Sequence, residues 1–243
     1  MNRLRAVVPS FALAWALFAL ATLSPRIVAG FGSGPALLEQ PWFTHFVGKS
    51  TLAILALAAM AAAGGPWRDW GFRAPANPRW RFSALRGCLL GAAATILLIV
   101  SPAQGMTWIR DLGLPGIVLW IWLHSSFTEE LFVRGWFQHF VRPASRRPLE
   151  FGSWSLSPEV VLSGVLFGSM HLTILAWGAD WWTVAIIVPA TTLLGLCAAE
   201  DRARSGSLAP AVLSHVAFNL GGFLAGVAAA IAYVVATGQK PSF

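Results

Sequence analysis

Two adjacent glutamates lie inside an otherwise apolar stretch of this sequence. Glu129 and Glu130 occupy the middle of the apolar run 114–140, and Arg134 follows one helical turn later. A charge at the centre of a bilayer costs at least about 2.5 kcal/mol, so such residues normally line a cavity and serve a function. On a helix Glu130 and Arg134 share a face, which leaves Glu129 as the unpaired carboxylate. We expect Glu129 to act as a base and the other two to support it. The alternative is a buried ion cluster that only stabilises helix contacts.

Two histidines and an asparagine in other apolar runs complete a set of groups suited to hydrolytic chemistry. His171 follows Phe167 by four residues, and His215 precedes Asn219 by four, so each pair shares a helix face. A histidine in an apolar run is more often a core residue than a catalyst. Together with Glu129, however, two imidazoles and a carboxamide at membrane depth are suited to activating water and stabilising an oxyanion.

The remaining histidines carry a weaker signal. His45 lies at the start of one apolar run and His139 at the end of another, where an interfacial role is expected. His124 either lines the same cavity as Glu129 or packs in the core. None of the three is expected to belong to the site.

The composition predicts a membrane protein. Of 243 residues, 56% are hydrophobic and 11% charged, which excludes an ordinary soluble globule. None of the apolar runs alternates as a barrel strand would, so the expected fold is all-α: a polytopic transmembrane bundle of seven or eight helices. An eighth helix would arise if Gly221-Gly222 broke the last run. The third run is short enough to fall short of a full span. The runs cover 6–23, 45–65, 87–102, 114–140, 158–176, 181–199 and 208–236.

The chemistry is concentrated in the second half of the chain. Residues 1–113 are expected to form three amino-terminal spans and residues 114–243 the motif-bearing core, within a single membrane domain. Arg3, Arg5 and the run 6–23 resemble a secretory signal peptide, but the length of the run and the spans that follow favour an uncleaved first helix. Cys88 and Cys197 both lie in apolar runs, so neither a disulfide framework nor a metal-ligand spacing is expected.

The charges indicate an orientation in the membrane. The formal net charge is +7, but the basic residues are scattered over short loops and form no patch for nucleic acid. An amino terminus in the cytoplasm of a bacterial-type inner or plasma membrane puts twelve arginines on that side and leaves Arg26, Lys49, Arg110 and Lys240 on the other. The twelve are Arg3, Arg5, Arg68, Arg73, Arg79, Arg81, Arg86, Arg142, Arg146, Arg147, Arg202 and Arg204.

The ordered motifs resemble those of the CAAX protease and bacteriocin-processing family of membrane endopeptidases. They are Glu129-Glu130-x-x-x-Arg134, Phe167-x-x-x-His171 and His215-x-x-x-Asn219, within about 114–222. One departure is Phe218, where family members often carry a second asparagine. The resemblance implies that Glu129 and His171 activate water, that His215 and Asn219 stabilise the oxyanion, and that Glu130 and Arg134 hold the geometry.

The resemblance also implies a substrate anchored in the bilayer by a lipid or a transmembrane helix. Prenylated CAAX peptides, bacteriocin leaders and carboxy-terminal sorting tags are all compatible with the motifs. No cofactor is expected. The alternative within the enzyme class is a zinc protease in which Glu129, His171 and His215 are ligands. The alternative outside it is a transport protein, membrane chaperone or immunity factor, although the chain lacks the paired halves of a transporter.

Overall fold

The computed structural model describes residues 4–31, 35–103, 112–142, 149–151 and 154–239. Seven long helices run through this part of the chain. Six of them are α1 (Leu4–Gly30), α2 (Pro41–Ala63), α3 (Trp80–Val100), α7 (Pro158–Met170), which continues as the 3-10 helix η7 (His171–Trp177), α8 (Trp181–Ser205) and α9 (Ala209–Thr237).

The seventh, which we call the central helix, is not a regular α-helix. Its α-helical segments alternate with π-helical ones, but the backbone stays helical across every junction. It consists of α4 (Gly113–Gly116), η4 (Ile117–Ser125), α5 (Ser126–Glu130), η5 (Leu131–Phe137) and α6 (Gln138–Val141). Two short 3-10 turns, η1 (Pro35–Leu37) and η2 (Trp67–Trp70), and a hairpin of β1 (Leu149–Phe151) and β2 (Trp154–Leu156) lie between the long helices.

The predicted all-α polytopic bundle is confirmed. Six of the described helices are long and apolar enough to cross a membrane. The expectation that the third span is short is wrong, because α3 begins at Trp80, seven residues before the apolar run, and has 21 residues. Arg81 and Arg86 extend this helix at its polar end, where long basic side chains can reach the interface. The last span does not break, since α9 continues through Gly221-Gly222 for 29 residues.

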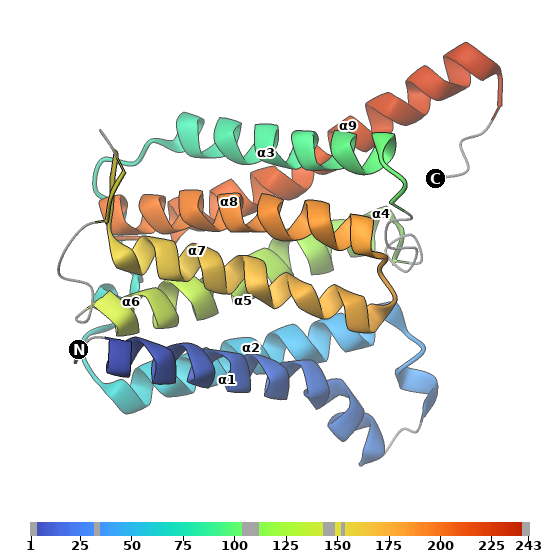
Figure 1. The fold of residues 1–243 in the computed structure, drawn as a ribbon. Helices are drawn as coiled ribbons and strands as arrows, with labels where there is room; N and C mark the ends of the chain where they lie inside the picture. The colour runs from blue at the N-terminus through green and yellow to red at the C-terminus, as the bar shows by residue number, and fades with distance from the viewer. Residues whose placement is uncertain (1–3, 32–34, 104–111, 143–148, 152–153, 240–243) are drawn as a thin grey trace.

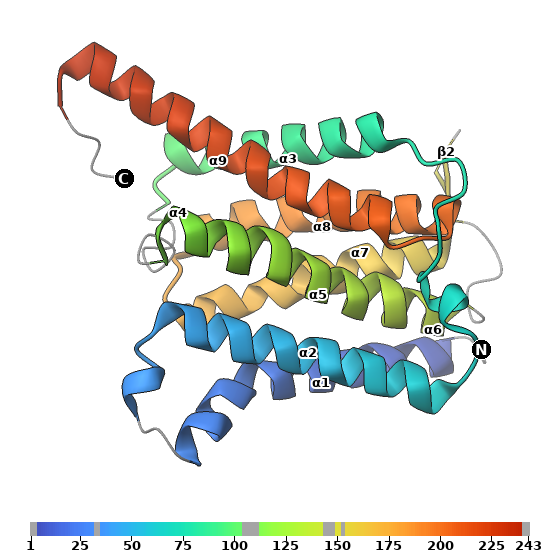
Figure 2. The ribbon, with the colours of Figure 1, turned by 180° about the vertical axis from the view of Figure 1, so that it is seen from behind.

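The helices form a bundle in which a pair of helices covers each of two opposite sides. The antiparallel pair α1 and α2 covers one side, α3 packs along α9 on the opposite side, and the central helix, α7 and α8 lie between them (Figures 1 and 2). The amino terminus, the hairpin and α6 gather at one end of the bundle, and α4 lies near the other (Figure 1). This arrangement surrounds the central helix, which carries the two glutamates, with helices on several sides.

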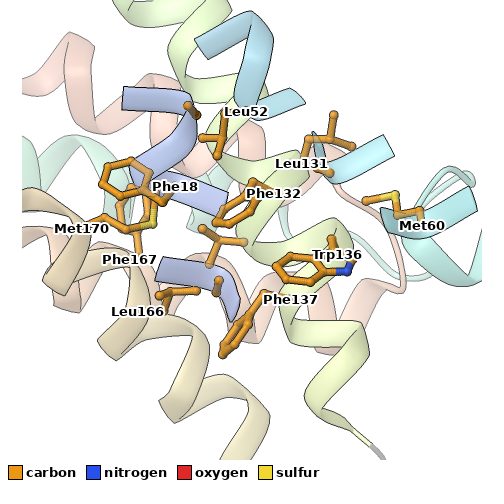
Figure 3. Packing of buried hydrophobic residues seen from close by; sticks show 14 of the residues in the cluster. Phe18, Leu52, Met60, Leu131, Phe132, Trp136, Phe137, Leu166, Phe167 and Met170 are labelled. Atoms are coloured by element: carbon orange, nitrogen blue, oxygen red, sulfur yellow. The ribbon is translucent and has the colours of Figure 1, made fainter. Parts of the chain in front are cut away.

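An aromatic core fixes the central helix against its neighbours. Phe132, Trp136 and Phe137 of η5 are fully or almost fully buried, and Figure 3 shows them among side chains of α1, α2 and α7. Phe18, Leu52, Met60, Leu166, Phe167 and Met170 provide these contacts. Burial of large side chains on this scale makes η5 a rigid support for the charged residues beside it.

Glycines allow α3 and α9 to approach at backbone distance. A Cβ atom added at Gly87 would collide with the Ser214 carbonyl, and one added at Gly91 would collide with the Phe218 carbonyl. From the other side, a Cβ added at Gly221 would collide with the Cys88 carbonyl. Small residues at such spacing are the usual means by which membrane helices pack closely. The glycines therefore set the position of α9, which carries His215 and Asn219.

Candidate active site

The two glutamates lie at the centre of the bundle, on the short α5 segment between the two π-helical stretches. Glu130 is fully buried and Glu129 is 6% exposed. π-Helical turns are rare and occur frequently at functional sites. The hydrophobic pattern predicts a helix here but not its π-helical turns, because the run is apolar on nearly every face. The carboxylates are thus held at membrane depth and away from solvent.

Glu130 pairs with Arg134, as predicted. The Arg134 Nη1 donates to Glu130 Oε1 at 3.0 Å, and its Nη2 donates to the carbonyl of Gly195 in α8 at 2.9 Å. The guanidinium also lies over the Phe167 ring, 4.4 Å from its centre. Both side chains are fully buried. Arg134 therefore joins the central helix to α7 and α8 and fixes the Glu130 carboxylate.

His215 lies between the two glutamates. Its Nδ1 is 2.9 Å from Glu130 Oε1, and its Nε2 is 3.8 Å from Glu129 Oε2. Because an ionised carboxylate only accepts hydrogen bonds, the Nδ1–H must donate to Glu130. The sequence analysis assigned Glu130 to Arg134 alone, so this second contact was missed. Glu130 thereby orients His215 with its Nε2 towards Glu129.

His171 and Asn219 are the remaining predicted residues of this centre. The His171 Nδ1 donates to the Phe167 carbonyl at 2.9 Å, which leaves its Nε2 as the acceptor of the neutral ring. His171 is within electrostatic range of Glu129 and His215, and the Phe167 ring contacts both imidazoles at 4.9 and 5.3 Å between centroids. Asn219 Nδ2 donates to the buried Ser126 Oγ at 3.1 Å. Three separate helices thus supply the predicted groups.

Lys49 contributes a contact that the sequence analysis did not foresee. Its Nζ donates to Glu129 Oε1, and both side chains are mostly buried. The expectation that Glu129 is unpaired is therefore wrong, as is the assignment of Lys49 to a polar loop. Lys49 lies inside α2, nine residues into the helix. The sequence did carry a signal for this contact, since Lys49 lies within an apolar run, where a charged side chain needs a partner.

The comparison with protein families identifies the segment that carries these contacts. Residues 111–221 match the family described as Type II CAAX prenyl endopeptidase Rce1-like. This part of the chain is similar to that family. No curated protein and no solved structure matches the chain in two further comparisons.

The similarity to prenyl endopeptidases indicates a peptide hydrolase at the general level. All six predicted site residues, from Glu129 to Asn219, fall within the matched segment. Lys49 lies outside it, in α2, and reaches the site only through the packing of α2 on the central helix. The cluster therefore combines residues of the family segment with one from the amino-terminal helices.

Two further histidines lie closer to this candidate site than expected. His45 is buried in α2, within electrostatic range of Lys49 and Glu129, so the interfacial role predicted for it is wrong. His124 stacks on Phe46 at 5.6 Å, and its Nε2 is 3.2 Å from Ser50 Oγ. His139 stays at the helix end, against Trp70 at 4.3 Å. His45 and His124 thus both lie near Lys49, whereas His139 lies at the helix end.

The zinc alternative requires Glu129, His171 and His215 to surround a single ion. Among the described residues, no group of three or more His, Cys, Asp and Glu side chains is placed to hold a metal ion. In addition, the Lys49 ammonium occupies one oxygen of Glu129, where a second cation would be repelled. Zinc-ligating histidines do, however, make the Nδ1 contacts seen at His171 and His215. The residue types alone therefore do not distinguish a zinc-dependent mechanism from a metal-free one, and an activity measurement must do so.

Proposed function

We propose that this protein is an intramembrane endopeptidase that uses Glu129 as the base for peptide hydrolysis. The observation that supports it best is the difference between the two adjacent glutamates. Glu130 is fixed by Arg134 and His215, whereas the Oε2 of Glu129 faces the His215 Nε2 at 3.8 Å, a gap that is not closed by a hydrogen bond. The Glu129 Oε2 can therefore accept a proton from a bound water, and the His215 ring beside it is placed to meet the carbonyl oxygen that the water attacks.

In the proposed reaction, Glu129, assisted by His171, takes one proton from a water molecule. The oxygen of this water bonds to the scissile carbonyl carbon at the same time. The negative charge then develops on the carbonyl oxygen, to which Asn219 donates and to which the His215 Nε2 donates when the ring carries both protons. The C–N bond breaks, and the abstracted proton passes to the leaving amine. Removing such a base or such a donor typically lowers the rate by about 10²- to 10⁴-fold.

The substrate is a peptide held at the membrane by a lipid or a transmembrane helix. The depth of the site supports this, because both glutamates are buried in a bundle whose outer helices are apolar. A prenylated CAAX-type carboxy terminus is the substrate class that the family description names. A carboxy-terminal sorting tag or a leader peptide presents the same chemistry at the same depth.

The experiment that tests the function compares protein termini in membranes. Cells that lack the gene are supplied with the wild-type chain, with Glu129→Gln or with Glu200→Gln, and the carboxy and amino termini of their membrane proteins are compared by mass spectrometry. Glu200 is the matched control, because its side chain is 46% exposed and lies outside the cluster. We expect wild type and Glu200→Gln to generate the same new termini and Glu129→Gln to generate none, although it folds and inserts. Wild-type termini with Glu129→Gln would refute the proposal.

Zinc dependence is the second candidate, because of the Nδ1 contacts of the two histidines. We propose that activity survives exhaustive treatment with a membrane-permeant chelator and is lost in Asn219→Ala. In a zinc enzyme the outcome is reversed, since the ion would activate the water and Asn219 would be a bystander. A stoichiometric metal whose removal abolishes cleavage and whose return restores it would establish the zinc mechanism instead.

A further inference from the structure

A polar cavity that borders the glutamate cluster at Arg134 lies at the end of the bundle that carries the amino terminus. It has a volume of about 400 Å³ and opens to the surface. The segment after α2, the end of the central helix, the start of α7 and the end of α8 form its walls. Neither Glu129 nor either histidine of the cluster contributes to it. The charged side chains at its walls are Arg68, Arg73, Arg134, Arg142, Arg202, Asp69 and Glu159.

The charges of this cavity are not balanced. Four arginines face two carboxylates, and a fifth arginine, Arg134, reaches its inner wall but is already neutralised by Glu130. Among the described residues, the one ion pair between these wall charges joins Arg68 to Asp69 at 3.8 Å, with both side chains largely exposed. Exposed pairs of this length are weak. The cavity therefore keeps a net positive charge.

Arg202 is the buried centre of this positive charge. It is 8% exposed, and its Nη2 donates to the backbone carbonyl of Asp69 at 2.8 Å. Its Nε is buried without a hydrogen-bond partner. Arg73 and Arg142 both lie within electrostatic range of it. Three guanidinium groups gathered around a cavity repel one another, and a bound anion would offset that repulsion.

Two of the wall arginines are held in position by hydrogen bonds to backbone carbonyls, without any bound anion. Arg73 Nε donates to the Gly206 carbonyl at 2.9 Å, in the same way that Arg202 donates to Asp69. These contacts attach the segment after α2 to the turn between α8 and α9. Each arginine keeps further N–H groups for a ligand, since a guanidinium carries five. Glu159, which is 9% exposed, has a buried Oε2 without a hydrogen-bond partner and can accept from a hydroxyl or amine.

We propose that this cavity binds a phosphate group, carried by an anionic phospholipid or by a soluble phosphate ester. Arginines bind phosphate through paired hydrogen bonds, and the size of the cavity is that of a small-ligand site. The cavity lies at the ends of the apolar helices, where lipid headgroups lie, and basic pockets between such helices bind anionic headgroups. Acceptors such as Glu159 would suit a headgroup that also carries hydroxyl or amine donors.

The test uses the purified full-length protein and does not depend on its activity. Thermal stability and retained lipid, by native mass spectrometry, are measured in neutral detergent with added phosphatidylglycerol, phosphatidylcholine or inorganic phosphate. The double variant Arg68→Gln and Arg142→Gln removes two exposed charges of the wall, and the matched control Arg79→Gln and Arg81→Gln removes two exposed arginines outside it. The buried Arg202 is left intact so that each protein folds.

We expect phosphatidylglycerol to raise the stability of the wild type and of the control, and phosphatidylcholine to have no effect. The apparent affinity should fall about 10- to 30-fold in the wall variant. Stabilisation by inorganic phosphate as well would identify a soluble phosphate ester as the source of the group. If neither anion stabilises the wild type, or if the wall variant binds as tightly as the control variant, the proposal is wrong.

Discussion

At the scale of single residues, two adjacent glutamates of one helix are given different surroundings. Glu130 contacts Arg134 and His215, so it acts through its neighbours as a positioning residue. Glu129 contacts Lys49 through one oxygen and faces His215 with the other. In the proposed mechanism, Lys49 keeps Glu129 charged and oriented in a site with little water. Different partners, rather than different residue types, therefore divide the roles of the pair.

The role of Lys49 can be tested by removing its charge. We expect Lys49→Met to lower the free energy of unfolding by about 3 kcal/mol and to abolish cleavage, because it leaves Glu129 buried without a counter-ion. Thermal unfolding in detergent and the assay of protein termini are the measurements. Lys49→Arg keeps the charge and should retain most of the stability. A Lys49→Met protein as stable and active as wild type would show that the ion pair serves no purpose.

The role of Glu130 can be separated from that of Glu129 by stability. Glu130→Gln leaves Arg134 charged in a fully buried position, so a loss of about 3–5 kcal/mol should accompany the loss of activity. Glu200→Gln is the matched control, and its effect should stay within about 1 kcal/mol because its pair with Arg86 is partly exposed. Equal unfolding temperatures for Glu130→Gln and Glu200→Gln would contradict this assignment.

At the scale of elements, the site depends on how closely α3 and α9 pack. His215 and Asn219 lie on α9, and the carbonyls of Ser214 and Phe218, adjacent to them in sequence, touch the glycines of α3. Any change that moves α9 away from α3 should shift both groups relative to Glu129. The glycines thus affect catalysis although none of them contacts the cluster.

This close packing predicts that replacing a glycine of α3 by alanine lowers the stability of the protein instead of raising it. An alanine in a helix normally stabilises it by up to about 1 kcal/mol relative to glycine. Gly91→Ala should instead destabilise the protein by about 1–3 kcal/mol and reduce cleavage, because the new methyl group collides with the Phe218 carbonyl. Gly30→Ala is the matched control, since nothing lies within 4 Å of its added Cβ. A gain in stability at both positions would disprove the close contact.

At the scale of the whole molecule, the odd number of long helices in the described chain places its two ends on opposite faces of the bundle (Figure 1). The arginines of the described chain concentrate at the end with the amino terminus, where the proposed phosphate site also lies. Since Lys49 is buried in α2, the predicted count of basic residues on the other face falls from four to three, which strengthens the asymmetry. Of these three, Arg110 and Lys240 lie outside the described residues, as do Arg3, Arg146 and Arg147 of the first group.

The orientation is therefore predicted with the amino terminus and the segment after α2 in the cytoplasm. Single cysteines are introduced as Ala76→Cys and, at the opposite end, Gln239→Cys, in a chain without Cys88 and Cys197. Both positions are exposed. In intact cells or spheroplasts, an impermeant thiol reagent should label Gln239→Cys and not Ala76→Cys. If only Ala76→Cys is labelled, the orientation in the membrane is the opposite of the predicted one.

The amino-acid sequence by itself determined the helical class, the approximate positions of the spans and the residues of the cluster other than Lys49. Those features depend on local properties: the length of apolar runs, and charged or polar groups that are costly within them. The pairing of Glu130 with Arg134 could also be predicted, because residues four apart on a helix are neighbours. The limits of α3 could not, because a polar helix end has no hydrophobic signal.

Only the tertiary structure decided which groups meet across the bundle. Lys49 and Glu129 are 80 positions apart, and His215 and Glu130 are 85 apart, so no sequence spacing connects them. The arginine cavity likewise joins the ends of helices far apart in the chain. The sequence identifies which residues need partners, because burying an unpaired charge is costly, but the packing of α2, α8 and α9 around the central helix selects those partners.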